Sequence, residues 1–437
     1  MSSLPLWASG VIGAGIFFIL MFLKMHVGVS LMIGGFIGFW MTRSFGAATS
    51  TLATTILDTA TSDILIIIPL FVVMGTIAAA GGPIGSAFDT FNKWVGHLRG
   101  GLSMAAVCSC AAFGAVCGDN IATAMVMDKA ALPAMRKYGY KDSLALGSIA
   151  AGGGLGIMIP PSAAFVVYGF ITETSIAELF ISGIIPGIVL TVMFCIQIAI
   201  QCKLQPHLCD VQEPFSWKQR FIALRGLIAI IVGFLVVVIG LLAAIFTPQE
   251  AGALGALAML IVSLPYRQLT FKKFAGAFIE AVNIGAMILV LIFGARYFSN
   301  FLTSSTIAAS ISDAVIGSGM NKYGVMLLVV IVYLILGCLM DIWSVMIITL
   351  PIFFPVLMQL GFDPLQLGVI TVLCIMAGTI TPPVGVVVFT LAGAHPETPM
   401  YTIFRGVGWF VLTEAIMLVI LIFVPQLSNW LPSIISY

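Results

Sequence analysis

The sequence predicts an all-α protein that crosses a membrane many times, in about 11–12 segments that include two re-entrant hairpins and two broken helices. Hydrophobic residues make up 61% of the 437 residues and charged residues 8%, whereas a soluble protein carries about 25% charged residues. Such a chain cannot cover its surface with polar groups, so lipid must be its solvent. In lipid every backbone amide needs an internal partner, and long apolar runs without period-two alternation favour helices over a closed barrel.

The predicted segments are apolar runs separated by short polar stretches. They lie at 7–23, 27–41, 64–80, 101–135, 144–171, 179–201, 226–246, 251–264, 284–302, 324–360, 366–393 and 407–429. We expect 7–23 to be a retained first helix, because the N-terminus has no basic region and no clear cleavage site of a signal peptide.

Two segments, 101–135 and 324–360, are too long for one crossing of a hydrocarbon core about 30 Å thick at about 1.5 Å per residue. A polar interruption lies near the middle of each, at Gly118-Asp119-Asn120 and at Met340-Asp341-Ile342. We therefore expect each to be a hairpin that enters the membrane and turns back.

Two other segments, 144–171 and 366–393, carry a glycine and a Pro-Pro pair at mid-span. Proline removes a backbone donor and cannot continue a regular helix. These segments are therefore predicted to be helices broken inside the membrane.

Basic residues in two polar stretches predict which side is cytoplasmic. The first stretch, 201–225, holds Lys203, Lys218, Arg220 and Arg225, and the second, two apolar segments later, holds Arg267, Lys272 and Lys273. An even number of crossings puts both stretches on one side, and the positive-inside tendency makes that side cytoplasmic. Residues 216–224 could form an amphipathic helix that lies flat at the membrane interface. No loop is large enough to hold a soluble substrate-binding or nucleotide-binding domain.

Composition also excludes some classes of site. The net charge of +1 leaves no basic footprint, so we expect no nucleic-acid partner. The eight cysteines lie in or beside apolar runs, and Cys108 and Cys110 are the one close pair, with no histidine to complete a metal set. They are interpreted as free thiols in the protein core.

Six residues of the first half recur in the second half at one offset. Adding 222 to the residue number converts the first set into the second without a gap: Asp119, Pro133, Gly139, Gly156, Pro160 and Pro161 become Asp341, Pro355, Gly361, Gly378, Pro382 and Pro383. This pattern predicts an inverted structural repeat with a first repeat at 1–200, a cytoplasmic linker at 201–225 and a second repeat at 226–437. Secondary transporters are commonly built in this way, with ion and substrate sites at the helix breaks. The alternative is that the breaks only kink the helices.

A broken helix offers backbone carbonyls that suit a small cation and backbone amides that suit an anion. The candidate ligands of a metal ion are therefore residues at the tips and breaks that offer side-chain oxygens or accessible backbone carbonyls: Asp119, Asn120, Gly154, Gly156, Pro160, Asp341, Gly378, Thr379 and Thr381. The candidate substrate-binding residues are Asn120, Thr123, Ser162, Ser344, Thr381 and Arg296.

Each of these interpretations has an alternative. Asp119 and Asp341 could cap the half-helices that follow them instead of binding a cation, and the two roles do not exclude each other. Arg296 could contact an anionic substrate, or it could extend its charge to the membrane surface from the end of a helix.

The second half, "MDIWSVMIITLPIFFPVLMQLGFDPLQLGVITV" followed by "AGTITPPVGVVVF", resembles the large membrane subunit of tripartite ATP-independent periplasmic (TRAP) transporters. The blocks "PAMRKYGY", "GGGLGIMIPPSAAFVVYGFITETSIAELFISGIIPG" and "FTPQEAGALGALAML" match the patterns of the first half and the linker. The resemblance covers nearly the whole chain. The chain departs from the family pattern at Gly118-Asp119-Asn120, where the family usually has a small serine-rich tip.

This resemblance implies an elevator-type symporter in the bacterial inner membrane that takes up an organic acid anion, such as a C4-dicarboxylate or sialic acid, with Na+. It also implies two protein partners, a small four-helix membrane subunit and a soluble periplasmic substrate-binding protein. Some relatives fuse the small subunit before the large one. We expect a separate chain here, because no four further helices precede the repeat.

Two rival functions differ in the sequence features that they require. A one-component sodium/carboxylate symporter could share the repeat and work without a binding protein. An intramembrane aspartyl protease would need a Tyr-Asp and a Gly-x-Gly-Asp motif, but Asp341 follows Met340, and Asp119 follows Val116-Cys117-Gly118. We therefore expect a transport protein that is not an enzyme.

Overall fold

The computed structural model describes residues 6–23, 25–62, 66–243, 245–307, 310, 317 and 319–435. In the first half the α-helices are α1 Leu6–Phe22, α2 Val27–Thr42, α3 Phe45–Ala60, α4 Ile67–Gly81, α5 Pro83–Val95, α6 Gly101–Cys117, α7 Asn120–Lys137, α8 Asp142–Met158, α9 Ala163–Thr172 and α10 Ile176–Leu204. In the rest they are α11 Trp217–Ala223, α12 Ile228–Leu242, α13 Pro248–Ser263, α14 Phe271–Ser304, α16 Lys322–Leu339, α17 Ile342–Gln359, α18 Pro364–Ile380, α19 Val386–Ala394, α20 Met400–Phe423 and α21 Gln426–Ile434. In the described part of the chain all regular secondary structure is helical and no strand is present, as predicted.

Several helices are long and apolar enough to cross a membrane. Within the described ranges six helices meet that test alone, and the number of spans rises to as many as eight if each of two bent helix pairs is one span. Four further apolar helices are shorter, Leu6–Met21, Val27–Thr42, Gly101–Cys117 and Pro364–Ile380. The chain is thus a multi-pass membrane protein. Two of the short helices belong to the interrupted segments: Gly101–Cys117 is the first half of a hairpin, and Pro364–Ile380 is the first half of a broken helix.

The helices of the two halves correspond at the offset that relates the repeated residues. Adding 222 to the bounds of α7 and α8 gives 342–359 and 364–380, which are the bounds of α17 and α18. The shifted α1 and α2 overlap α12 and α13, and α6 and α9 overlap α16 and α19. Both hairpins and both broken helices are therefore confirmed, each within a few residues of the predicted bounds.

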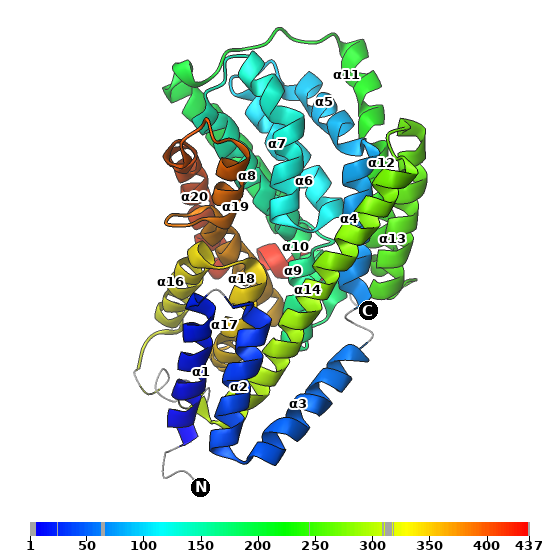
Figure 1. Cartoon of the computed structure of the whole chain (residues 1–437). Helices are drawn as coiled ribbons and strands as arrows, with labels where there is room; N and C mark the ends of the chain where they lie inside the picture. Colours follow the sequence, from blue (N-terminus) through cyan, green and yellow to red (C-terminus); the bar gives the residue numbers. More distant parts are fainter. Residues whose placement is uncertain are drawn as a thin grey trace.

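The two halves run in opposite directions through the molecule. At the start of α8, Asp142 accepts a hydrogen bond at 2.5 Å from Thr398, just before α20 begins. At the start of α18, Gln366 donates a bond of 2.9 Å to the carbonyl of Leu421, near the end of α20. Because α20 has 24 residues and rises about 1.5 Å per residue, the starts of α8 and α18 lie at opposite ends. Figure 1 shows the hairpin α6–α7 in the upper half and α16–α17 in the lower half.

The end of the molecule that carries residues 205–227 is called the linker end here and lies at the top of Figure 1. A helix is present where residues 216–224 were expected to form one. It is α11, whose start is fixed by a capping box of Ser216 and Gln219. Its Phe221 packs edge-on against Trp94 of α5 with ring centroids 5.7 Å apart. The linker therefore lies against the first repeat.

Several elements differ from the prediction. Helix α5 lies outside every predicted segment, and the segment predicted at 407–429 is divided between α20 and α21. Helix α3 was not expected, because its threonine-rich sequence is less apolar than a spanning segment. Helix α4 bends by 68° into α5 at Gly82, whose φ of 101° favours glycine. The segment predicted at 284–302 is part of the longer α14, which spans 34 residues and corresponds at the offset to α3 and α4 joined.

Candidate functional site

The first hairpin turns at Gly118 and Asp119. Gly118 ends α6 with a φ of 69°, in the left-handed region that favours glycine. The Oδ1 atom of Asp119 accepts the backbone N–H of Ala122 at 2.7 Å, and the hydroxyl of Thr123 donates to the Asp119 carbonyl at 2.5 Å. Asp119 therefore caps α7, as the alternative interpretation of this carboxylate predicted.

The second hairpin has an equivalent cap. Oδ2 of Asp341 accepts the N–H of Ser344 at 3.1 Å, and Oδ1 accepts its hydroxyl at 2.6 Å. Ala122 and Ser344 are counterparts at the repeat offset, so the two aspartates cap the same position in each repeat. The hydroxyl of Ser344, a candidate substrate-binding residue, is thus bound to Asp341.

Each hairpin end is bonded to the far half of the broken helix that follows it. The N–H of Ala163, at the start of α9, donates to the carbonyl of Gly118 at 3.4 Å. The N–H of Gly385, just before α19, donates to the carbonyl of Cys338 at 3.1 Å. Each half of the chain therefore forms a unit in which a hairpin end and a helix break meet, as the sequence predicted.

A hydrogen bond between buried side chains joins the first tip to the second broken helix. Nδ2 of Asn120, at the first tip, donates to Oγ1 of Thr379, before the second break, at 3.3 Å. Both side chains are buried. The structure thus brings together two predicted site residues that are 259 positions apart in the sequence.

The hydroxyls at the breaks bind carbonyls of the preceding half-helix. Ser162 donates to the carbonyl of Ile157 at 2.5 Å, and Thr381 donates to that of Ala377 at 2.6 Å. These bonds satisfy carbonyls that a broken helix leaves without a partner. The first break, with Pro160, is buried, whereas residues 382–384 at the second break are exposed.

The glycines predicted as ligands allow close helix packing. A Cβ on Gly156 would lie 2.5 Å from the Thr123 hydroxyl and 2.6 Å from the Asp119 carbonyl. A Cβ on Gly154 would lie 2.5 Å from the side chain of Met376. A Cβ on Gly378 would lie 2.7 Å from the Cα of Gly337 in the second hairpin. Gly156 and Gly378 thus hold the hairpins against the breaks, and Gly154 faces α18.

A cavity of about 1080 Å³, called the linker cavity here, lies beside the first hairpin. Cys117 and Ala122, on either side of the tip, line it, and so does Ala223 of α11. Lys129 of α7 and Lys273 of α14 line it with their exposed side chains. Glu280 and the ion pair of Lys93 with Asp89 line it too. The cavity therefore connects the first tip with the linker end, and its charges are mixed, with three lysines and two acids.

Arg296 lies apart from the tips. It lines a second cavity, of about 560 Å³, together with Glu173 and Gln249. Its guanidinium lies 4.7 Å from the ring centroid of Phe170, a distance typical of a cation–π contact. The structure does not bring Arg296 together with the other predicted substrate-binding residues.

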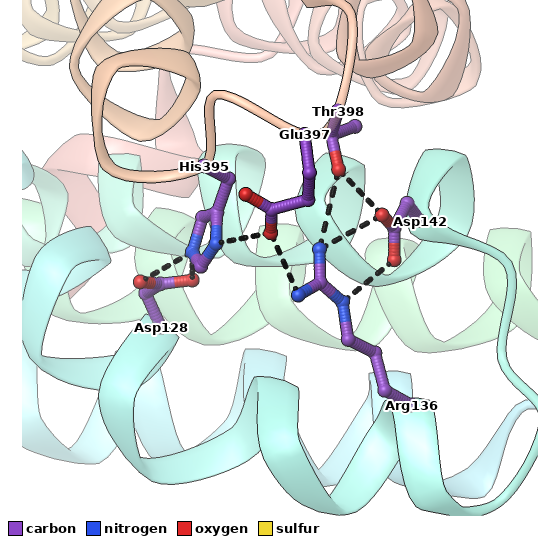
Figure 2. A network of polar contacts seen from close by, with 6 residues as sticks. All are labelled: Asp128, Arg136, Asp142, His395, Glu397 and Thr398. Carbon is purple, nitrogen blue, oxygen red and sulfur yellow. Dashed lines mark hydrogen bonds and ion pairs between the residues drawn. The ribbon is translucent and has the colours of Figure 1, made fainter.

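A polar network connects α7 and α8 with the loop after α19 (Figure 2). Arg136 binds Asp142 through two bonds, of 3.0 and 2.8 Å, and Glu397 through one of 2.9 Å. His395 contacts the buried Asp128 at 2.8 Å and Glu397 at 3.2 Å. The network ties the first hairpin to the loop that follows the second broken helix.

Hydrogen bonds set the ionisation of this network. The bonds to Asp142 raise the pKa of Arg136 above its usual value. Burial opposes ionisation of Asp142, but bonds from Arg136 and Thr398 outweigh it and hold the pKa of this carboxyl below its usual value. The pKa of Glu397 is lowered by its own backbone N–H and by Arg136. At neutral pH the network therefore holds a cation between two carboxylates.

Sequence reasoning missed this network and the cavity lysines. Arg136 lies in the quoted block "PAMRKYGY", but its partners Glu397 and Thr398 follow 261 and 262 positions later. The repeat gives no signal either, because the counterpart of Arg136 is Met358. Bonds between residues so far apart in the sequence depend on how the two halves of the chain pack against each other, which the sequence pattern does not reveal.

The two hairpins, the two broken helices and their meeting point define a membrane transport protein with inverted repeats. Residues 14–427 match the family model described as tripartite ATP-independent periplasmic transporter, DctM component. The chain belongs to this family, which makes it a multi-pass protein of the inner membrane.

Relatives with different substrates in their names are similar over most of the chain. The C4-dicarboxylate TRAP transporter large permease protein DctM of Pseudomonas aeruginosa is 34% identical, over 87% of this chain and 89% of its own length. The ectoine/5-hydroxyectoine TRAP transporter large permease protein UehC of Ruegeria pomeroyi is 31% identical, over 94% and 96%. The sialic acid TRAP transporter permease protein SiaT of Haemophilus influenzae is 28% identical, over 96% and 68%.

The fold also resembles a solved structure. The crystal structure of the YdaH transporter of Alcanivorax borkumensis superposes with a TM-score of 0.57 at 15% sequence identity, over 88% of this chain and 90% of that one. The likeness concerns the fold alone. Together with the family match it confirms the predicted class of all-α transport protein.

Proposed function

We propose that this chain is the membrane subunit through which a TRAP transporter imports an organic acid anion together with Na+. The observation that carries the proposal is the bond between Asn120 and Thr379, which joins the first tip to the second broken helix. Ala122, two residues after Asn120, lines the linker cavity. Sites at the meeting point of two such repeats are typical of secondary transporters.

Na+ would be a transported ion in this scheme and would bind mainly to backbone carbonyls. The first tip supplies the Asp119 carbonyl, which lies against Gly156 of the first broken helix. Carbonyl oxygens at a helix break suit a small hard cation. Among the described residues no group of three or more His, Cys, Asp or Glu side chains could hold a metal ion, so the backbone is the more suitable source of ligands.

The substrate would be an anion with one or more carboxylates, such as a C4-dicarboxylate or sialic acid. Lys129 and Lys273 line the linker cavity, and neither has an ion-pair partner among the described residues. The cavity also holds Glu280 and the ion pair of Lys93 with Asp89, so its lysines exceed its acids by one. An excess of positive charge in a cleft favours an anion. The substrate would leave through this cavity toward the linker end, which we assign to the cytoplasm.

The transporter would also need two protein partners, a small membrane subunit and a soluble periplasmic binding protein, since the family description is of a tripartite system. The binding protein would deliver the substrate, and an elevator movement of the tips and breaks would carry it across. A one-component symporter is the alternative.

Uptake by proteoliposomes tests this proposal. Vesicles that hold this chain and the small subunit should accumulate substrate when the loaded binding protein and an inward Na+ gradient are both present, without ATP. Omission of the binding protein should abolish uptake. Undiminished uptake without it would contradict the tripartite proposal and favour the one-component symporter.

A further inference from the structure

Glu414 of α20 is a fully buried carboxyl group that the proposed function does not use. Its exposed fraction is 0%. Neither of its carboxylate oxygens has a hydrogen-bond partner among the described residues. At the repeat offset its counterpart is Val192, so the duplicated fold does not require an acid at this position.

The helices around Glu414 supply no cation to neutralise it. Helix α20 packs mainly against α8, α18, α10 and α19. The charged residues of α8 and α10 are Asp142, Glu178 and Lys203, all near helix ends, and α18 and α19 contain none. On α20 itself the exposed Arg405 lies nine residues earlier, or about 13.5 Å along the axis. No cation of these five helices therefore lies beside Glu414.

An ionised carboxylate without a partner is very unfavourable in an apolar interior, and such a group takes up a proton instead. A metal cation is a poor alternative, because hard cations need several oxygen ligands at once. Neither oxygen of Glu414 meets a polar partner in the described structure, and the residue lines neither the linker cavity nor the cavity of Arg296.

We propose that Glu414 is a proton-binding site inside the membrane part of the protein. In the arrangement described here the side chain is a neutral acid, formed when the carboxylate takes one proton from water. The proton returns to water when the packing around α20 opens. The packing of α20 is then linked to the proton concentration, independently of any sodium site at the tips.

Thermal unfolding of the full chain in its membrane complex tests this proposal between pH 5 and pH 8. The native state binds a proton at Glu414, whereas the unfolded state is ionised above a pKa of about 4.3. Native stability therefore falls as pH rises, by about tenfold in the folding equilibrium per pH unit. Glu414→Gln removes this dependence, so its Tm should exceed that of the wild type by a margin that grows with pH.

The matched control is Glu213→Gln, which changes an exposed glutamate of the linker in the same way. Its Tm should follow the wild type at every pH. A difference between Glu414→Gln and the wild type that does not change with pH would overturn the proposal.

A second measurement applies even if Glu414→Gln does not fold. Infrared spectra of the wild-type complex at pH 7 should contain the carbonyl band of a protonated carboxylic acid, since exposed carboxylates are ionised at that pH. Absence of this band in the wild type would overturn the proposal. Where the Gln variant folds, the band should lose intensity.

Discussion

Asp119 illustrates how one side chain at a helix start can serve both structure and ion binding. Its cap on Ala122, with a bond of 2.7 Å, explains why a short acid is found where the first hairpin turns back. When ionised, the same carboxylate would place a negative charge beside the carbonyls proposed to bind Na+. A cap alone would be replaceable by serine, so substitution separates the two roles.

We predict that Asp119→Ser keeps sodium-driven uptake but weakens the apparent affinity for Na+. Serine caps a helix about as well as aspartate, so the fold should persist. Asp119→Lys should abolish uptake, because two like charges about 4 Å apart at an effective dielectric constant of about 20 repel by about 4 kcal/mol. The measurement is the Na+ concentration dependence of uptake, with the amount of each variant in the membrane determined. An active lysine variant with unchanged Na+ dependence would place the ion elsewhere.

Among the elements, the hairpins and broken helices could be predicted from the sequence because they depend on local chemistry. Asp caps, Gly turns and Pro-Pro breaks leave a local signal, and the constant offset between the repeats relates the bounds of α17 and α18 to those of α7 and α8. Helix α3, the bend at Gly82 and the network of Arg136 could not be predicted, because they depend on how distant helices pack. The position of Arg296, apart from the tips, is set by packing as well.

The network of Arg136 leads to a prediction about the stability that its ion pairs contribute. Arg136→Gln should lower the stability of the complex by about 1 kcal/mol at pH 7, the upper range for a partly exposed ion pair. The pKa of Asp142 is below its usual value, so its contribution is present above about pH 4 and is lost as pH falls further. The difference in Tm between variant and wild type should therefore shrink toward pH 3.

The matched control for this series is Arg43→Gln, since Arg43 is exposed and forms no ion pair with the described residues. Its Tm should follow that of the wild type throughout. If the effect of Arg136→Gln were the same at pH 7 and pH 3, ion pairing with Asp142 would not be its cause.

For the whole molecule, opposite orientation of the two repeats predicts the positions of two exposed loops. Lys141 lies at the linker end, where its backbone N–H donates to the carbonyl of Leu208 at 2.9 Å. Its counterpart at the repeat offset is Asp363, at the start of α18. Single cysteines at these positions, in a chain without native cysteines, should react from opposite sides of the membrane. Reaction from the same side would make the repeats parallel and would remove the basis of the elevator proposal.

The central claim is that movement of an organic acid through this chain is coupled to Na+ at the meeting point of the two repeats. The most direct test is the simultaneous flux of radioactive Na+ and substrate into proteoliposomes that hold the complete three-component system. We expect substrate to drive Na+ entry at a fixed ratio in the wild type. Substrate uptake that proceeds equally in K+ alone, with no accompanying Na+ entry, would contradict the account.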